Sequence, residues 1–342
     1  MNILASAAVE YTQKLLEIDS PTGYTARAAA YLLETLTSLG FHPVKTRKGC
    51  VLCTLGGEGH PLVLSAHVDT LGLMVSQIQE NGRISFTRLG GASLQAVETE
   101  NIRLYTREGK CYTGVIELKN ASIHVNRELE ETKRDLKTLE ILLDENILSR
   151  SDAENLGISA GDVICLDPRV RVQENGFIRS RFLDDKLSAG MLLALAESVS
   201  QGKVSLARKT TLFFSVYEEV GHGAAAGIPQ DTEDLLVVDM GCVGEGVNCT
   251  ERQVSICAKD SAGPYDYEMT SELIAIAKEE KLDYAVDVYP AYGSDAGAAL
   301  GAGADIRYAL IGAGVYASHG YERSHWLGVE NTLKLLEAYL NK

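Results

Sequence analysis

Two kinds of hydrophobic periodicity alternate along this chain, and their order limits the folds available to it. In the first 72 residues, apolar residues at helical spacing are followed by short apolar runs of strand length. From about Leu73 the apolar residues alternate with polar ones, with a turn sequence at Asn81-Gly82, as in antiparallel sheets. Apolar residues at helical spacing and short apolar runs return near residue 167. The chain therefore reads as an α/β domain interrupted by a β-rich module.

This pattern predicts an α/β domain formed by residues 1–72 and 167–342, with an inserted β-rich domain over 73–166. The length of 342 residues favours two units, because single cores stop growing at roughly 250–300 residues. In the α/β domain we expect helices at 5–18, 26–39, 186–200, 271–281, 294–300 and 329–340, and strands at 51–55, 62–66, 211–216, 235–238, 284–289 and 308–312. In the insert we expect strands at 74–79, 83–87, 102–106 and 112–117, and a charged helix at 127–136.

The composition argues against several classes of protein. Acidic residues outnumber basic ones 47 to 32, and the net charge of -15 would be repelled by nucleic acid and by anionic membranes. No stretch reaches the roughly 20 apolar residues of a membrane span, and the first residues read as an amphipathic helix. The seven cysteines are scattered, as is typical of reduced thiols. We therefore expect a cytoplasmic protein without a nucleic-acid or membrane partner.

Acidic residues and a histidine stand where four apolar runs end. The runs are LVLSAHVD, RFLDDK, TLFFSVYEE and LLVVD, and they present His67, Asp69, Asp184, Asp185, Glu218, Glu219 and Asp239. Active sites of open α/β sheets lie at the carboxyl ends of strands, so these side chains could converge on one crevice. One acidic residue can simply mark the exit of a strand into water. Acidic pairs at several such ends would repel one another unless a cation relieved them.

The types of side chain in these clusters indicate which ions could bind. Imidazole and carboxylate ligands without thiolate suit zinc, cobalt or manganese in a hydrolytic site. Two metal ions roughly 3.5–4 Å apart need one bridging carboxylate and terminal ligands on either side. The clusters supply side chains of the types that such a pair of ions would require.

Five motifs in this chain resemble, in their order and spacing, the TET-type, glutamyl aminopeptidase-like family of co-catalytic zinc peptidases. They are SPTGYT at 20–25, HVD at 67–69, DDK at 184–186, EEVG at 218–221 and VVDMG at 237–241. The resemblance also covers the insert, through LGISAGDVICLDP at 156–168. It implies a three-layer, mixed-sheet exopeptidase domain with a small PDZ-like or barrel-like dimerisation domain. It further implies homo-oligomers built from dimers, up to a hollow dodecamer.

The resemblance assigns the metal ligands motif by motif. Glu219 would hold the first metal, His67 and Asp239 would hold the second, and Asp184 would bridge the two ions. The peptide bond between Asp184 and Asp185 is expected to be cis.

The remaining roles follow from the same resemblance. Asp69 would orient the imidazole of His67, and Glu218 would be the general base that takes a proton from the attacking water and returns it to the leaving amine. The last ligand should be a histidine in YASHGYERSHWLGVENT, which offers His319 and His325. We favour His319 because it follows an expected strand and a small-residue loop, whereas His325 lies close to the terminal helix.

The segment 293–295 and His222 can each be interpreted in two ways. Gly293-Ser294-Asp295 opens an expected helix, and this segment could line the substrate crevice through the helix N-terminus. Ser294 could instead serve only as an N-cap. His222 follows EEVG, so it could contact substrate or be an ordinary loop residue.

Together these observations predict a metallo-aminopeptidase that hydrolyses the N-terminal bond of peptide substrates. A deacylase or carboxypeptidase-like amidase could use the same metal pair on another amide, since site chemistry does not define the substrate. A catalytically silent scaffold or binding relative would be expected to have lost a ligand or the base. Every required residue is present in this chain.

Overall fold

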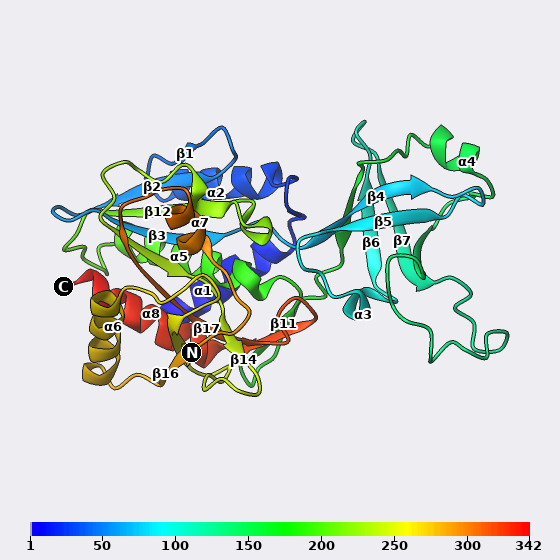
Figure 1. Ribbon diagram of the computed structural model, residues 1–342. Helices are drawn as coiled ribbons and strands as arrows, with labels where there is room; N and C mark the ends of the chain where they lie inside the picture. Colours follow the sequence, from blue (N-terminus) through cyan, green and yellow to red (C-terminus); the bar gives the residue numbers. More distant parts are fainter. Residues whose placement is uncertain (1) are drawn as a thin grey trace. The chain divides into compact units, whose positions relative to one another are not determined.

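The computed structural model describes residues 2–342, and the chain divides into two compact units (Figure 1). One unit is formed by the chain up to Thr70 together with Arg169–Lys342, and the other is Leu71–Pro168. The expected α/β class is confirmed, with a large mixed sheet in the first unit and a closed barrel in the second. No helix within 2–342 combines the length and apolar character needed to cross a membrane.

The larger unit is built around a twelve-stranded mixed sheet. Its strands are β1 (Val44–Lys45), β2 (Val51–Gly56), β3 (Leu62–His67), β10 (Arg171–Val172), β11 (Phe177–Ser180), β12 (Thr210–Ser215), β13 (Asp234–Val238), β14 (Gly241–Val243), β15 (Val254–Lys259), β16 (Tyr284–Val288), β17 (Arg307–Tyr316) and β18 (Glu322–His325). The main path is β1-β2-β12-β3-β13-β17-β18-β11-β10, while β14 and β15 pair with β17, and β16 pairs with β15.

The centre of this sheet brings several strand ends to one edge. β12 and β13 both pair in parallel with β3, and β13 pairs in parallel with β17. Every residue of β3, β12 and β13 is buried, which means that both faces of the sheet are covered here. The carboxyl ends of the three strands therefore lie together, where α/β proteins build their sites.

Helices provide the cover over the sheet. They are α1 (Ile3–Leu16), α2 (Ala26–Ser38), α5 (Leu183–Ser200), α6 (Tyr267–Glu279), α7 (Asp295–Gly301) and α8 (Trp326–Leu340). α1 packs on α5 and α8, and these two contact β3 and β17, respectively. α2 contacts β2, α7 contacts β13, and α6 contacts β15. α5 is buried along nearly its whole length, so it is the central helix of this unit.

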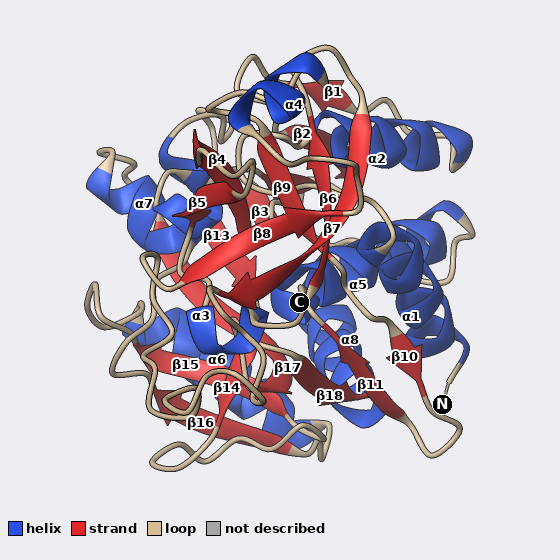
Figure 2. Cartoon of the chain, turned by 90° about the vertical axis from the view of Figure 1, so that its right-hand side faces the viewer, coloured by secondary structure: helices blue, strands red, loops and turns tan. Residues whose placement is uncertain are grey.

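The smaller unit is a closed barrel with the strand order β4-β5-β8-β7-β6-β9 (Figure 2). Its elements are β4 (Gly72–Ile78), β5 (Ile84–Leu89), α3 (Leu94–Val97), β6 (Asn101–Tyr105), β7 (Cys111–Leu118), β8 (Leu139–Leu143), α4 (Arg150–Asn155) and β9 (Val163–Leu166). All its strand pairs are antiparallel. Closure pairs each strand on both sides, which removes free sheet edges.

The charged helix expected at 127–136 is wrong, because these residues form turns and bends. A guanidinium nitrogen of Arg134 donates to the carbonyl oxygens of Leu129 and Thr132, at 3.0 and 2.7 Å. The same side chain pairs with Glu98 at 2.7 Å. The segment contains good helix formers but no apolar face to bury, and tertiary contacts of this kind then decide its conformation.

Candidate metal centre

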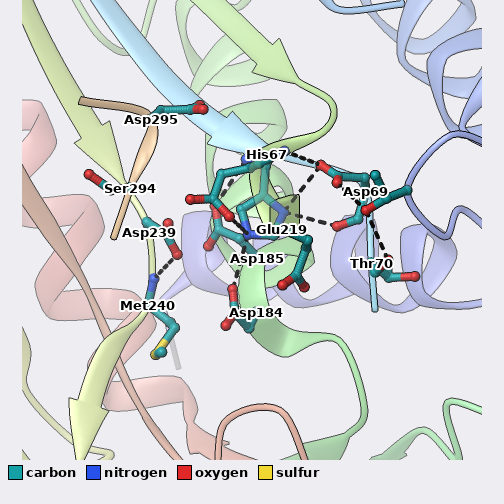
Figure 3. Close-up of polar contacts among 12 residues, drawn as sticks. His67, Asp69, Thr70, Asp184, Asp185, Glu219, Asp239, Met240, Ser294 and Asp295 are labelled. Carbon is teal, nitrogen blue, oxygen red and sulfur yellow. Dashed lines mark hydrogen bonds and ion pairs between the residues drawn. The ribbon is translucent and has the colours of Figure 1, made fainter. Parts of the chain in front are cut away.

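His67 is the last residue of β3, and its buried ring lies in the middle of the polar cluster (Figure 3). Its Nδ1 is 2.9 Å from the carbonyl oxygen of Asp69, and its Nε2 is 3.0 Å from Oδ1 of Asp184. The same Nε2 is 3.7 Å from Oε2 of Glu218. A carbonyl oxygen can only accept, so Nδ1 carries the proton and donates to it. The unprotonated Nε2 then faces the carboxylates, which is the arrangement of a metal-ligating histidine.

Asp184 and Asp185 begin α5 with backbone angles that are not helical, and the peptide bond between them is cis, as expected. The preceding Phe182 has a φ of 67°, in the left-handed region that a bulky residue rarely adopts. Asp184 faces His67 with one oxygen, and its other oxygen is 3.5 Å from Nε2 of His319. One carboxylate thus reaches histidines from two separate segments, as a bridging ligand must.

Glu218 and Glu219 lie in the 3₁₀ turn η1 (Glu218–Val220), directly after β12. Tyr217 before this turn and Gly221 after it both have positive φ, so the chain turns sharply at the strand end. Oε2 of Glu219 is 3.6 Å from Nε2 of His319. Oε1 of Glu219 is buried and has no hydrogen-bond partner. Glu218 has a side chain that is 14% exposed, against 3% for Glu219, so it is the more accessible of the two.

Asp185 and Asp239 form a second group around His67. Oδ2 of Asp185 accepts a hydrogen bond from the backbone N–H of His67 at 3.2 Å, whereas its Oδ1 is buried without a partner. Asp239 follows β13 and accepts from the N–H of Met240 at 2.7 Å. Ligand atoms lie within 4.8 Å of one another in two groups, His67 with Asp184 and Glu219, and His67 with Asp185 and Asp239. No ligand or catalytic role was predicted for Asp185.

Asp69 contacts both His67 and the turn that carries Glu218, and the second contact was not predicted from the sequence. Its carboxylate accepts from the hydroxyl of Thr22 at 2.7 Å and from the backbone N–H of Glu218 at 3.2 Å. It lies 3.7 Å from Nδ1 of His67, so the closer partner of the ring is the backbone carbonyl of Asp69. Asp69 therefore holds both the histidine and the turn that carries Glu218.

The two C-terminal histidines lie in different surroundings. His319, with a φ of 63° and a side chain 40% exposed, faces Asp184 and Glu219. His325 is buried outside the cluster, where its Nδ1 accepts from the N–H of Leu327 and caps α8, and its Nε2 donates to the carbonyl of Asn175. The structure therefore brings His319, and not His325, to the other site residues.

Glu322 is a site residue that sequence reasoning missed. Its buried carboxylate accepts from the backbone N–H of His319 at 3.0 Å and from that of Asp184 at 3.1 Å. It thus ties together the two segments that face each other in the cluster. The signal was available in the sequence, as the acidic residue three positions after His319 in HGYE.

The electrostatics of the cluster show a shortage of positive charge. Burial and the charge of Asp184 raise the pKa of Asp239 to about 7, and burial holds the pKa values of Glu218 and Glu219 well above their usual range. Burial alone would raise the pKa of Asp184 too, but hydrogen bonds with His319 and His67 outweigh it and lower that pKa. A hydrogen bond to Asp184 raises the pKa of His319 to about 10.

The residues present fit bound cations. Five acidic side chains converge on two histidines, and two carboxylate oxygens there are buried without a partner; the five are Asp184, Asp185, Glu218, Glu219 and Asp239. An uncompensated buried charge is costly, so such a set is stable when ionised only if cations neutralise it.

The cluster opens into a cleft of about 730 Å³. Cluster residues form part of the lining, and the rest comes from residues 221, 240, 242, 261–262, 291–294, 297–298 and 318. Ser294 both lines this cleft and caps α7, since its hydroxyl accepts from the N–H of Ala296 at 3.3 Å. Ser294 is therefore an N-cap that also lies on the wall of the cleft. His222 is exposed, and the described residues that line the cleft do not include it.

A carboxylate and histidine cluster at the carboxyl edge of a mixed α/β sheet is typical of a metal-dependent hydrolase. The match to known sequences is more specific, because residues 49–335 match the M42 glutamyl aminopeptidase family. The chain belongs to this family and is a metal-dependent aminopeptidase. This membership favours neither the amidase nor the silent scaffold considered above.

Individual proteins agree with the family assignment. The Bacillus subtilis (strain 168) protein YhfE, described as a candidate aminopeptidase, is 40% identical over 334 residues, which cover 97% of this chain and 96% of YhfE. The TET aminopeptidase from Thaumarchaeota archaeon SCGC AB-539-E09 has the same fold, with a TM-score of 0.87 and 20% identity over 98% of this chain and 97% of that one. The dodecameric PhTET1-12s has a TM-score of 0.83 and 20% identity over 99% of both chains.

Proposed function

We propose that this protein removes the N-terminal residue from peptides with two divalent metal ions held in the cluster around His67. Zinc is the ion we expect, and the nitrogen and oxygen ligands also suit cobalt or manganese. The observation that carries the proposal is the two groups of imidazole and carboxylate atoms around His67, each within 4.8 Å, together with the buried oxygen of Glu219 that has no hydrogen-bond partner.

The distances support a division of the ligands between two ions. Glu219 and His319, 3.6 Å apart, would hold the first ion, and His67 and Asp239 would hold the second. Asp184 would be shared, because its oxygens face His67 and His319 separately, at 3.0 and 3.5 Å. When bound, the ions would polarise the substrate carbonyl and lower the pKa of the attacking water.

The chain itself supplies the proton transfer. Glu218 is partly exposed and lies against His67, 3.7 Å from its Nε2. We assign it as the general base, which takes a proton from water and returns it to the leaving amine nitrogen. Asp69 would position both groups through its carbonyl contact with His67 and its hydrogen bond from the N–H of Glu218. Glu322 would hold His319 opposite Asp184.

We also propose a homo-oligomer that is assembled through the barrel unit, is built from dimers and extends up to a dodecamer such as that of PhTET1-12s. Four large apolar side chains of this unit are exposed, namely Ile123, Val125, Leu136 and Leu148, which would suit a surface that is covered on assembly. The seven free cysteines support a reducing, cytoplasmic location. Sedimentation of the intact protein, and of a variant with these four side chains made polar, tests the assembly.

The catalytic proposal is tested with purified protein loaded with zinc, cobalt or manganese. We expect two ions per chain by elemental analysis, release of residues from the free amino terminus, and no cleavage of the same peptides after N-acetylation. Cleavage that ignores acetylation would contradict aminopeptidase activity. A content that saturates at one ion would contradict the two-ion site.

A further inference from the structure

We infer that the cleft selects peptides whose N-terminal side chain is uncharged, an inference that rests on the proposed function. Outside the metal cluster, the described residues that line the cleft are all neutral, and most are small. The wall includes the exposed turn Ser261–Ala262 and, from the start of α7 and the loop before it, Ala291, Ser294 and Ala298. Outside the metal cluster, the described wall of the cleft therefore offers no opposite charge to a substrate side chain.

The carboxylate nearest to the turn at Ser261 is already satisfied. Asp260 is buried, and its Oδ1 accepts from the N–H groups of Ala262 and Gly263 at 2.8 and 3.2 Å. Its Oδ2 accepts from the hydroxyl of Tyr265 at 2.8 Å. Because these contacts use the carboxylate to hold the turn, Asp260 is not available to pair with a lysyl ammonium group.

The carboxylate beneath the start of α7 is occupied in the same way. Asp295 is buried, with Oδ1 accepting from the N–H of Ala224 at 2.8 Å and Oδ2 accepting from the hydroxyl of Ser65. Gly223 packs so closely on it that a Cβ there would lie 1.7 Å from Oδ1. This contact leaves no space for a substrate cation beside Asp295.

An acidic substrate side chain also lacks a partner. Lys48 donates to the backbone carbonyls of His222, at 2.7 Å, and of Gly223. Lys259 donates to the carbonyl of Asp260 at 2.8 Å. Neither lysine is among the described residues that line the cleft. Both cations therefore stabilise loops beside the site and lie outside the described lining of the cleft.

The remaining wall favours neutral groups for a physical reason. Tyr292 lines the cleft, its hydroxyl donates to the carbonyl of Met240 at 3.1 Å, and its ring lies 4.9 Å from that of Tyr289. This fixed aromatic surface gains from contact with apolar side chains. A charged side chain would instead lose water without gaining a counter-ion.

Kinetics on matched substrates test this selection in the metal-loaded protein. We expect kcat/KM for leucyl and methionyl substrates to exceed that for lysyl and glutamyl substrates by at least about tenfold. Calorimetry with uncleaved leucinamide and lysinamide on Glu218→Gln gives a second readout, and leucinamide should bind more tightly. Equal or better use of lysyl or glutamyl substrates would overturn this inference and leave the aminopeptidase function intact. No cleavage of any free peptide by protein with two ions bound would overturn both.

A charge added to the wall should redirect the selection. Ala262→Glu lies on an exposed turn and Ala298→Glu on α7, and the neutral controls are Ala262→Gln and Ala298→Gln. In at least one glutamate variant, the lysyl-to-leucyl ratio of kcat/KM should rise about tenfold over its glutamine control, as expected for opposite charges near a protein surface. Folded glutamate variants at both positions with the wild-type ratio would overturn the inference, because this wall would then not contact the substrate side chain.

Discussion

Buried carboxylates occur in both compact units, but their surroundings differ. In the barrel, Glu140 accepts a hydrogen bond from Gln79 at 3.2 Å and lies 3.6 Å from a guanidinium nitrogen of Arg83. In the cluster of the larger unit, Asp185 and Glu219 each keep a buried oxygen without a partner. Burial of an acidic residue is therefore not a sign of function by itself. A buried acidic residue whose hydrogen-bonding capacity is unmet calls for a further partner, such as a bound cation.

The largest expected effect is on kcat, and it distinguishes the proposed general base Glu218 from Glu140, a buried acid with a structural role. Glu218→Gln should lower kcat by about 10³-fold or more, because the amide cannot accept the proton from water. The barrel variant Glu140→Gln should leave kcat within about twofold of wild type, since the partners of Glu140 are Gln79 and Arg83 of the barrel and not residues of the cluster.

Elemental analysis and thermal unfolding complete this test. Both variants should keep two ions per chain, and Glu218→Gln should unfold close to the wild-type temperature. Full activity of Glu218→Gln would remove Glu218 as the base. Loss of metal in that variant would instead show that Glu218 is a ligand.

The second effect compares the two C-terminal histidines. His319→Ala should weaken the binding of one ion by at least about 100-fold, since second-sphere changes alone cost 10–100-fold. His325→Ala should keep both ions but lower the free energy of unfolding by about 1 kcal/mol, because α8 loses its N-cap. Metal titration and chemical denaturation measure both values. Two tightly bound ions in His319→Ala would exclude His319 as the ligand.

The positions of the residues at the strand ends could be predicted, because an apolar run followed by a polar residue is visible within a short stretch of sequence. His67, Glu218 and Asp239 follow long apolar runs that became the fully buried β3, β12 and β13. A parallel sheet then brings such ends to one edge, whatever its exact register.

The sequence marks Glu322 only as the acidic residue of HGYE, and its role could not be predicted because its position depends on long-range register. It opens β18, a four-residue strand that pairs with β11 so that Glu322 lies opposite Ser180. That register brings the carboxylate to the N–H of Asp184 at the start of α5. Strands of this length carry too few residues for a periodic signal. The same limit left Asp185 without a role, since its contact with the N–H of His67 depends on the packing of α5 on β3.

The third effect concerns stability without metal. In chelated protein near pH 8, Glu219→Gln should raise the free energy of unfolding by about 1 kcal/mol, because it removes a buried acid whose ionisation burial disfavours. Glu140→Gln should lower it by up to about 1 kcal/mol, because its pairing with Arg83 is lost. Denaturant titrations give both values. Destabilisation by both variants would mean that Glu219 is satisfied within the protein.

The smallest effect is a pH dependence of the metal-free protein. Burial raises the pKa of Asp239 to about 7, and hydrogen bonding to Asp184 raises that of His319 to about 10, so both groups bind more protons when folded than when unfolded. Stability must then fall as pH rises between about 5 and 9, whereas the lowered pKa of Asp184 acts only at lower pH. Chelated protein should therefore unfold several degrees lower at pH 8.5 than at pH 6. With zinc bound this decline should disappear, because the ions require the deprotonated ligands, and scanning calorimetry at both pH values compares the two states. An unfolding temperature that rises with pH in chelator would show that the cluster is already neutralised by the protein's own side chains.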